Sequence, residues 1–232
     1  MTADVEDAET LDVDNLWSLN LGEMSRSKDF KEFRLYFESL EKYGDQLSKM
    51  LAGTEILVDA LVKSGKELYG MVFKNCTHEI MMTDEVLQLF KNIKHIKALL
   101  HFEDTDLGRS TTVNILRRHT TEHQLIQPES TVNFIRCNLQ DKCLIFLRKF
   151  MASVPMVTLE ENPTLTREGV AKLIAFYRST EGSGKLYVKG RTEDLSDLDW
   201  DNNRLFHYTN NYDRSFNKNV TVEKSGGSSW NL

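Results

Sequence analysis

The sequence predicts an all-α fold, an elongated helical bundle with one long N-terminal helix. The main observation is a heptad-like spacing of mostly apolar positions, three and four residues apart, which is typical of a packed helix. No proline interrupts this stripe. Its positions are Phe30, Phe33, Phe37, Leu40, Gly44, Leu47, Leu51, Thr54, Val58, Leu61, Gly65, Leu68 and Val72.

The long helix is expected to begin after a cap at Ser27 or Asp29 and to end near Lys74–Thr77. A second apolar line lies one residue earlier on the helix, at Tyr36, Tyr43, Met50, Leu57 and Met71. A stripe this wide needs neighbours on two sides, so it predicts a bundle and not a two-stranded zipper.

Four shorter helices are predicted after the long one. Three begin at a cap residue that apolar positions at helical spacing follow, and one weaker helix ends before Pro128. Beyond them, Leu186-Tyr187-Val188 could form one short strand without an evident partner. No internal repeat is evident beyond the heptads. The expected helices run from Thr83 or Asp84 to about Phe102, over about 110–126, from Ser130 or Thr131 to about Ser153, and from Thr164 or Thr166 to about Ser179.

The predicted organisation is one helical domain over 27–180 between two tails. Residues 1–26 are acidic and are expected to be disordered, and residues 181–232 are polar and are expected to be largely disordered. The acidic start does not resemble a signal peptide, and no stretch has the length of a membrane span. The expected location is therefore cytoplasmic, with peripheral membrane association as an open alternative.

Charge and cysteine content narrow the function classes. The formal net charge of -6 argues against nucleic acid as a partner. The three cysteines, Cys76, Cys137 and Cys143, lack the spacing of a metal site. Their odd number and the absence of a secretion signal favour buried thiols over disulfides.

One string has the residue order of a zinc peptidase, His119-Thr120-Thr121-Glu122-His123. Histidines four apart on a helix can hold zinc, and the glutamate can act as a base. The polar flanks favour a solvated helix instead, so His119 and His123 are only weak metal candidates. Gly182-Ser183-Gly184-Lys185 lacks the spacing of a phosphate loop. We expect no enzymatic activity and no cofactor.

The middle of the chain is basic while both tails are acidic. Two interpretations stay open: a face that contacts anionic lipid, and a solvated face that pairs with the acidic tails. The candidate membrane contacts are Lys91, Lys94, Lys97, Arg117 and Arg118.

One stretch resembles a known family. Lys28-Asp29-Phe30-Lys31, Leu40, Leu47 and the run from Leu61 to Leu68 resemble the first helix of BAR domains, of the type found in Arf-GAP and oligophrenin-like proteins. This resemblance implies a curved dimer of long helices that binds acidic membranes, with Lys91, Lys94 and Lys97 as contacts. Gly108 and Pro128 depart from the family pattern, because they interrupt its second long helix.

The leading functional hypothesis is a non-enzymatic interaction or scaffold protein that acts by protein–protein assembly, with a homodimer as one form. The residues expected to carry self-association are Leu40, Leu47, Leu51, Val58 and Leu61. The alternatives are a BAR-like membrane-binding module and, more distantly, a zinc-dependent hydrolase.

Overall fold

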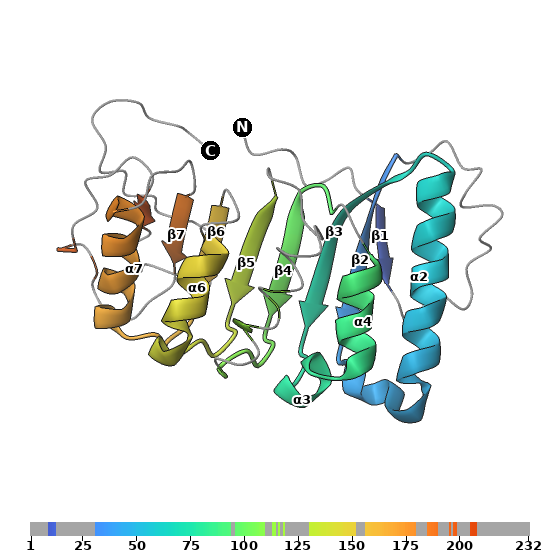
Figure 1. Ribbon diagram of the computed structural model, residues 1–232, viewed down its shortest axis with the longest axis horizontal. Helices are drawn as coiled ribbons and strands as arrows, with labels where there is room; N and C mark the ends of the chain where they lie inside the picture. The colour runs from blue at the N-terminus through green and yellow to red at the C-terminus, as the bar shows by residue number, and fades with distance from the viewer. Residues whose placement is uncertain are drawn as a thin grey trace, which may run out of the picture.

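Strands, not helices, form the centre of the molecule. In the computed structural model, the described residues contain eight strands that make one parallel sheet, flanked by helices (Figure 1). The all-α prediction is therefore wrong, and the fold is a parallel α/β fold. The structure describes residues 9–12, 31–93, 96–109, 113, 114, 116, 118, 130–151, 156–179, 185–189, 195, 197, 198 and 205–207.

The strands follow one another across the sheet in chain order, from β1 to β8. In a doubly wound sheet, the strand order reverses at a switch point and helices cover both faces. Within the described part of the chain there is no such reversal, so the architecture is that of a solenoid. The strands are β1 (Glu9–Asp12), β2 (Glu32–Glu38), β3 (Glu67–Lys74), β4 (Leu99–Glu103), β5 (Thr131–Ile135), β6 (Met156–Glu160), β7 (Lys185–Lys189) and β8 (Leu205–His207).

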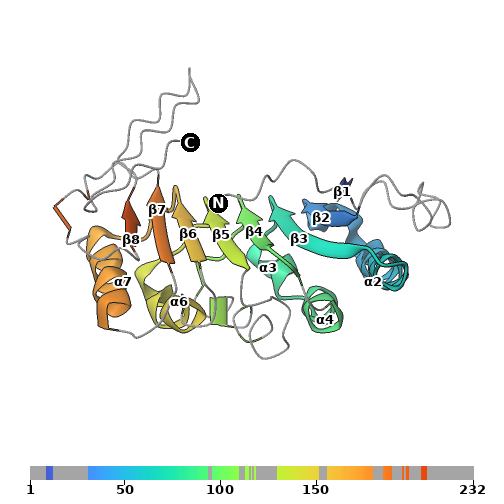
Figure 2. The same ribbon diagram turned by 90° about the horizontal axis from the view of Figure 1, so that it is seen from above.

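The described helices all lie on one face of this sheet (Figure 2). They occupy the connections that return the chain from the end of one strand to the start of the next. These helices are η3 (Leu40–Gln46), α2 (Leu47–Lys63), α3 (His78–Met81), α4 (Asp84–Asn92), η4 (Asp141–Cys143), α6 (Leu144–Met151) and α7 (Arg167–Ser179).

The predicted long helix is split into β2, η3, α2 and β3. In β2 the buried residues are Phe33, Leu35 and Phe37, which alternate with half-buried ones and so have the period of a strand. Only the middle of the stripe is helical, as a 3-10 helix in η3 and an α-helix in α2. Gly65 follows this helix with a φ of 86°, a left-handed conformation that glycine adopts without strain.

The shorter predicted helices are partly confirmed. The second is helical only over α4, where Thr83 caps the helix by accepting a hydrogen bond from Val86 N. Its remainder becomes β4, and the fourth predicted helix is divided into β5, η4 and α6. The fifth is confirmed as α7, and the Thr166 hydroxyl accepts a bond from Gly169 N at its start. Most of 110–126 lies outside the described residues.

The sheet also extends into both segments for which the sequence predicts disorder. Strand β1 comes from residues 1–26, and β7 and β8 come from residues 181–232. Leu186-Tyr187-Val188 does form part of a strand, but it has two partners, β6 and β8. Its buried residues, Leu186 and Val188, face the core.

An aromatic stack crosses the buried face of the sheet. Phe37 stacks on Phe73 with 4.8 Å between ring centroids, and Phe102 stacks on Phe73 at 5.7 Å and on Phe134 at 5.6 Å. These rings occupy equivalent positions on β2 to β5, because their strands pair in register. Each ring is buried against the helices, so the stack joins the strands into one core.

The same turn follows five successive strands. The first residue after β2 to β6 has a left-handed conformation, and its N–H donates to the last carbonyl of the next strand. The prediction that no internal repeat exists beyond the heptads is therefore wrong, because strand, turn and return connection recur. The left-handed residues are Ser39, Asn75, Asp104, Arg136 and Glu161.

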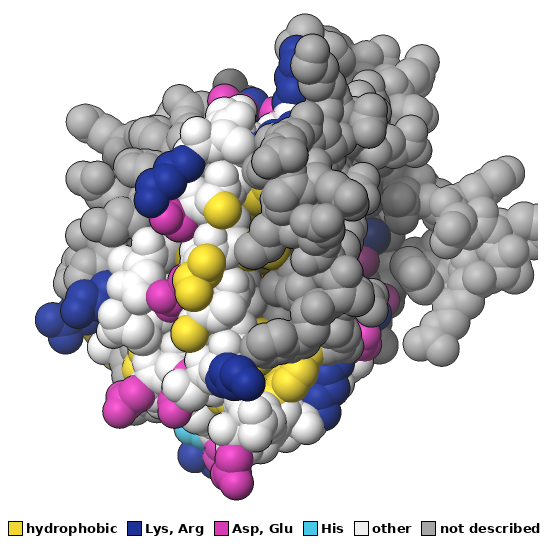
Figure 3. Space-filling view, turned by 90° about the vertical axis from the view of Figure 1, so that its right-hand side faces the viewer, with side chains coloured by type: hydrophobic (Ala, Val, Ile, Leu, Met, Phe, Trp, Pro, Cys, Tyr) yellow, Lys and Arg dark blue, Asp and Glu magenta, His cyan; other side chains and the backbone are white. Residues whose placement is uncertain are grey.

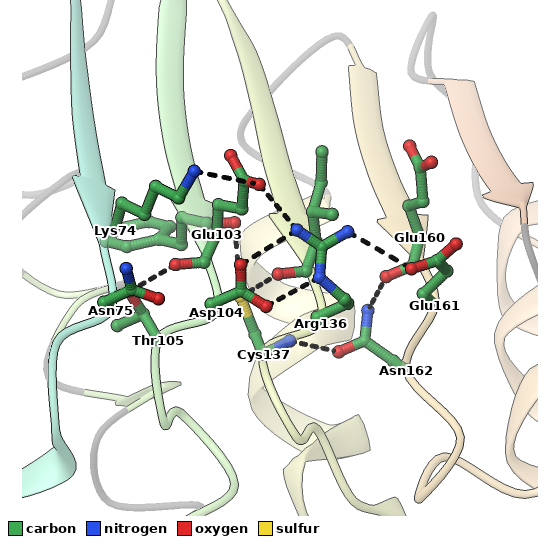
Figure 4. A network of polar contacts seen from close by, with 12 residues as sticks. Lys74, Asn75, Glu103, Asp104, Thr105, Arg136, Cys137, Glu160, Glu161 and Asn162 are labelled. Carbon is green, nitrogen blue, oxygen red and sulfur yellow. Dashed lines mark hydrogen bonds and ion pairs between the residues drawn. The ribbon is translucent and has the colours of Figure 1, made fainter. Parts of the chain in front are cut away.

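Buried polar side chains hold these turns together (Figure 4). The Thr105 hydroxyl donates to Phe73 O at 3.1 Å and accepts from Cys76 N at 3.4 Å. Asn162 donates to Phe134 O at 2.8 Å and accepts from Cys137 N at 2.9 Å. These bonds satisfy backbone groups that burial would otherwise leave unpaired.

All three cysteines are free and buried, as the sequence predicts. Burial raises the pKa of the Cys76 thiol to about 11 and also raises the pKa of the other two thiols. Cys137 is not on a helix but occupies the turn after β5, where its Sγ donates to Phe102 O. Cys76 and Cys137 are therefore packing and hydrogen-bonding groups of the turns, and Cys143 has the same role in η4, where its Sγ donates to Gly108 O.

Candidate functional site

The second face of the sheet, called the open face here, carries none of the described helices (Figure 2). Parallel sheets are usually covered on both faces and have nearly continuous apolar strands. Here β2, β4, β5 and β6 alternate strictly between buried and half-buried residues. The alternation predicts that the half-buried side chains of these strands meet solvent or a ligand.

A middle row of side chains crosses the open face. Its members pair in register from β2 to β7, so they are neighbours on adjacent strands, about 4.8 Å apart. The row has a tyrosine near each end and polar residues at its centre. It consists of Tyr36, Val72, His101, Asn133, Thr158 and Tyr187.

The centre of the middle row has unused hydrogen-bonding capacity. Asn133 Nδ2 lies 3.5 Å from His101 Nδ1. The Asn133 Oδ1 atom is buried and has no hydrogen-bond partner among the described residues. An unpaired buried acceptor is costly unless a ligand or water supplies a donor.

A charged rim lies at the carboxyl ends of the strands, beside the middle row. It combines the last residues of the strands with the first residues of the turns. The rim consists of Glu38, Lys74, Glu103, Asp104, Arg136, Glu160, Glu161 and Lys189.

Arg136 is the centre of this rim (Figure 4). Its guanidinium donates to Asp104 at 2.6 Å, to Glu103 at 2.5 Å and to Glu161 at 3.2 Å. Glu103 and Asp104 lie at the end of β4 and Glu161 follows β6, so one side chain joins three neighbouring units of the solenoid. Bonds of this charge-assisted type are shorter and stronger than neutral ones.

Electrostatic shifts follow this arrangement. The hydrogen bond from Arg136 lowers the pKa of Asp104, and the nearby charge of Glu103 raises the pKa of Lys74. Burial lowers the pKa of His101, although Glu103 opposes this effect. Burial thus favours the neutral form of the His101 ring, in which one ring nitrogen donates and the other accepts.

The basic residues predicted to contact membranes do not form one surface in the described residues. Lys91 is exposed in the last turn of α4, whereas Lys97 precedes β4 and pairs with Glu32 at 2.5 Å and Glu67 at 2.6 Å. Arg118 is exposed, and Lys94 and Arg117 lie outside the described residues. No described helix is long and apolar enough to cross a membrane.

The residues predicted to carry self-association lie inside the molecule. Their side chains pack in the single core between α2, η3 and the sheet, so they offer no seam to a second helix. The hypothesis of a BAR-like or helical scaffold is wrong for the same reason: long paired helices are not present in the described chain. The buried residues are Leu40, Leu47, Leu51, Val58 and Leu61.

The outer side of α2 shows some apolar side chains among charged ones (Figure 3). Two large ones are well exposed, Ile56 at 64% and Val62 at 49%. They lie outside the predicted stripe and are six residues apart on the helix, so they do not form one helical face.

The proposed zinc string cannot be placed, because His119, Glu122 and His123 lie outside the described residues. Across the part of the chain that the structure describes, no cluster of His, Cys, Asp and Glu side chains could hold a metal ion. At the rim, Arg136 occupies the position among the carboxylates that a cation would need. A zinc-dependent hydrolase thus receives no support from the fold.

Sequence reasoning missed every residue of the middle row and the rim. A sequence signal for these residues exists, because two segments share the same spacing of apolar and polar positions. Leu100-His101-Phe102-Glu103-Asp104-Thr105-Asp106-Leu107 and Val132-Asn133-Phe134-Ile135-Arg136-Cys137-Asn138-Leu139 align without a gap. Their alternating start and their shared polar position would have indicated strand and turn.

The fold and the site together place this protein in the class of parallel α/β solenoids, with one face of its sheet free of described helices. Comparison with protein-family models and with curated proteins finds no match for this chain.

Proposed function

We propose that this protein is a binding module without catalytic activity, and that it receives a protein ligand on the open face of its sheet. The observation that carries the proposal is the middle row, whose side chains are mostly half-buried and polar or aromatic, on a parallel sheet face without described helices. Solenoids use such extended sheet surfaces for binding.

The composition of the middle row favours a protein ligand. Tyrosine and asparagine are enriched where proteins bind proteins, because they combine contact area with adaptable hydrogen bonds. The rim has five carboxylates and three cations, a formal net charge of −2, so it does not attract nucleic acid or anionic lipid. Its cations are already engaged, as Arg136 pairs with three carboxylates and Lys189 lies 2.8 Å from Glu160.

The repeated spacing supports the same proposal. The segments from Leu100 and Val132 resemble the strand-and-turn pattern L-x-L-x-x-N/C-x-L of leucine-rich repeats. Phe102 and Phe134 replace the second leucine, Val132 replaces the first, and Thr105 and Cys137 are at the polar position. Asn162 occupies the same position after β6 and makes the same kind of bonds to the turn. This resemblance concerns the geometry of the repeated strand and turn. We infer from it a solenoid that presents its strands to a ligand.

The test is affinity capture from a lysate of cells that express the protein, with three baits. These are the wild type, Thr158→Arg at the centre of the open face, and Ala175→Arg on the exposed side of α7 as the matched control. We expect at least one captured protein to be lost with Thr158→Arg and retained with Ala175→Arg, and to bind the purified wild type directly.

Circular dichroism of both variants establishes that they fold. The proposal is wrong if every captured protein is retained by Thr158→Arg, or if the two variants lose the same proteins.

A further inference from the structure

The open face has more hydrogen-bond acceptors than donors over β4, β5 and β6. Glu103, Asp104, Glu160 and Glu161 supply four carboxylates, and Arg136 is the one cation of the rim on these strands and their turns. A carboxylate can accept about four hydrogen bonds, while a guanidinium donates at most five. Lys74 on β3 and Lys189 on β7 add one contact each, to Glu103 at 3.6 Å and to Glu160 at 2.8 Å. Together these three cations leave part of the acceptor capacity unused.

These acceptors lie at the surface but are largely screened from water. The side chain of Glu160 is 15% exposed, and those of Glu103 and Glu161 are each 24% exposed. A charge in such a setting interacts more strongly with an incoming cation than a fully solvated charge does. The rim can thus distinguish a cationic ligand from a neutral one.

A second acceptor lies one row away from the carboxylates. Asn133 belongs to β5 and flanks His101 in the register, and its buried Oδ1 has no partner in the described chain. Burial favours the neutral form of the neighbouring His101. A ligand that brings N–H donors would satisfy the amide and the carboxylates at once.

We propose that the open face binds a polypeptide segment that carries lysine or arginine side chains, seated over β4, β5 and β6 between the middle row and the rim. This inference rests on the proposed function, because it names the chemistry of the ligand for the same face. Charge complementarity selects this ligand over an acidic or purely apolar peptide. A metal ion is not the expected cation, since no described cluster has suitable ligands.

The experiment uses random dodecapeptides displayed on phage and selected on the full-length chain. Synthetic peptides from the enriched sequences are then measured by fluorescence anisotropy at two salt concentrations. We expect enrichment of lysine and arginine over the unselected library. We also expect weaker binding at high salt, because salt screens partly exposed charges.

Variants locate the binding site. Glu103→Gln and Glu160→Gln should each weaken binding about tenfold, the effect of losing one charge-assisted hydrogen bond. Glu168→Gln is the matched control, because that carboxylate is on α7 and is 75% exposed. It should leave the affinity unchanged.

The outcomes separate this inference from the proposed function. Peptides that lose binding with Thr158→Arg but contain no excess of lysine or arginine would overturn the inference and leave the proposed function intact. Peptides that Thr158→Arg does not affect would overturn both, and so would a selection that yields no binder.

Discussion

The two faces of one sheet, built from the same strands, differ in nearly every property. Towards the helices, β2 to β5 present stacked phenylalanine rings that are buried. On the open face, the alternate residues of β2, β4 and β5 are half-buried. The difference teaches that one alternating pattern can place core residues on one face of a strand and the residues of the proposed binding surface on the other. The following predictions test that division.

The largest effect is expected where the aromatic stack is broken. Phe102→Ala removes a ring that contacts Phe73 and Phe134, and it should lower the free energy of unfolding by about 3–5 kcal/mol. The neighbouring change His101→Ala, on the open face, should cost less than about 1 kcal/mol. Urea unfolding followed by circular dichroism measures both. Similar losses for the two variants would contradict the division of the strand.

The next effect concerns the buried turns. Asn162→Ala leaves Phe134 O and Cys137 N without their side-chain partner, so we expect a loss of about 2–4 kcal/mol. Asn92→Ala is the control, because this exposed amide bonds only to the side chains of Gln88 and Glu55. It should cost less than about 1 kcal/mol. The same urea titration measures both variants. If Asn92→Ala lowers the free energy of unfolding as much as Asn162→Ala, burial does not explain the loss at Asn162.

A smaller effect is expected at the rim. Arg136→Gln should cost about 1 kcal/mol at pH 7, because its partners are partly exposed and solvent screens the pairs. Arg136 lowers the folded-state pKa of Asp104 from its ordinary value of 3.8. The stability from this pair is therefore present above that value and is lost as the pH falls through the lower folded pKa. The gap between wild type and variant should narrow on acidification, and a gap independent of pH would exclude this mechanism.

The smallest effect is expected at Lys97, on the opposite end of the strands. Its ammonium pairs with Glu32 and Glu67, and these bonds raise the pKa of Lys97. Because the group is largely exposed, Lys97→Gln should cost about 0.5 kcal/mol or less, and the cost should shrink in 1 M salt. Unfolding at low and high salt measures it. If Lys97→Gln lowers the free energy of unfolding more than Arg136→Gln does, the expected order of the two ends of the strands is wrong.

The sequence predicted local features better than the fold. The cap at Thr83, the helix from Thr166 and the burial of the cysteines follow from nearby residues, and the structure confirms them. The stripe from Phe30 to Val72 misled because Phe33 and Phe37 fit helical spacing as well as the alternation that includes Leu35. Short apolar runs do not separate these two periods, and strand pairing depends on distant partners.

The site could not be predicted from charge or motifs. Glu103, Arg136 and Glu161 lie far apart in the chain and meet only because adjacent strands end in the same register. The residues next to each of them in the sequence give no sign that the other two belong to the same site. A comparison of the segments from Leu100 and Val132 would have revealed the repeated unit, and the unit would have placed these residues at the same end of the sheet.

The strict chain order of the strands has a consequence for how the molecule folds. Each strand pairs only with its immediate neighbours among the described strands, so ordering can start in one unit and propagate to the next. Each step closes only a short loop, and short loops cost little entropy. This favours rapid folding despite the all-parallel sheet. Removing a terminal unit should shorten the solenoid without abolishing it, while exposing a fresh apolar end that is liable to aggregate.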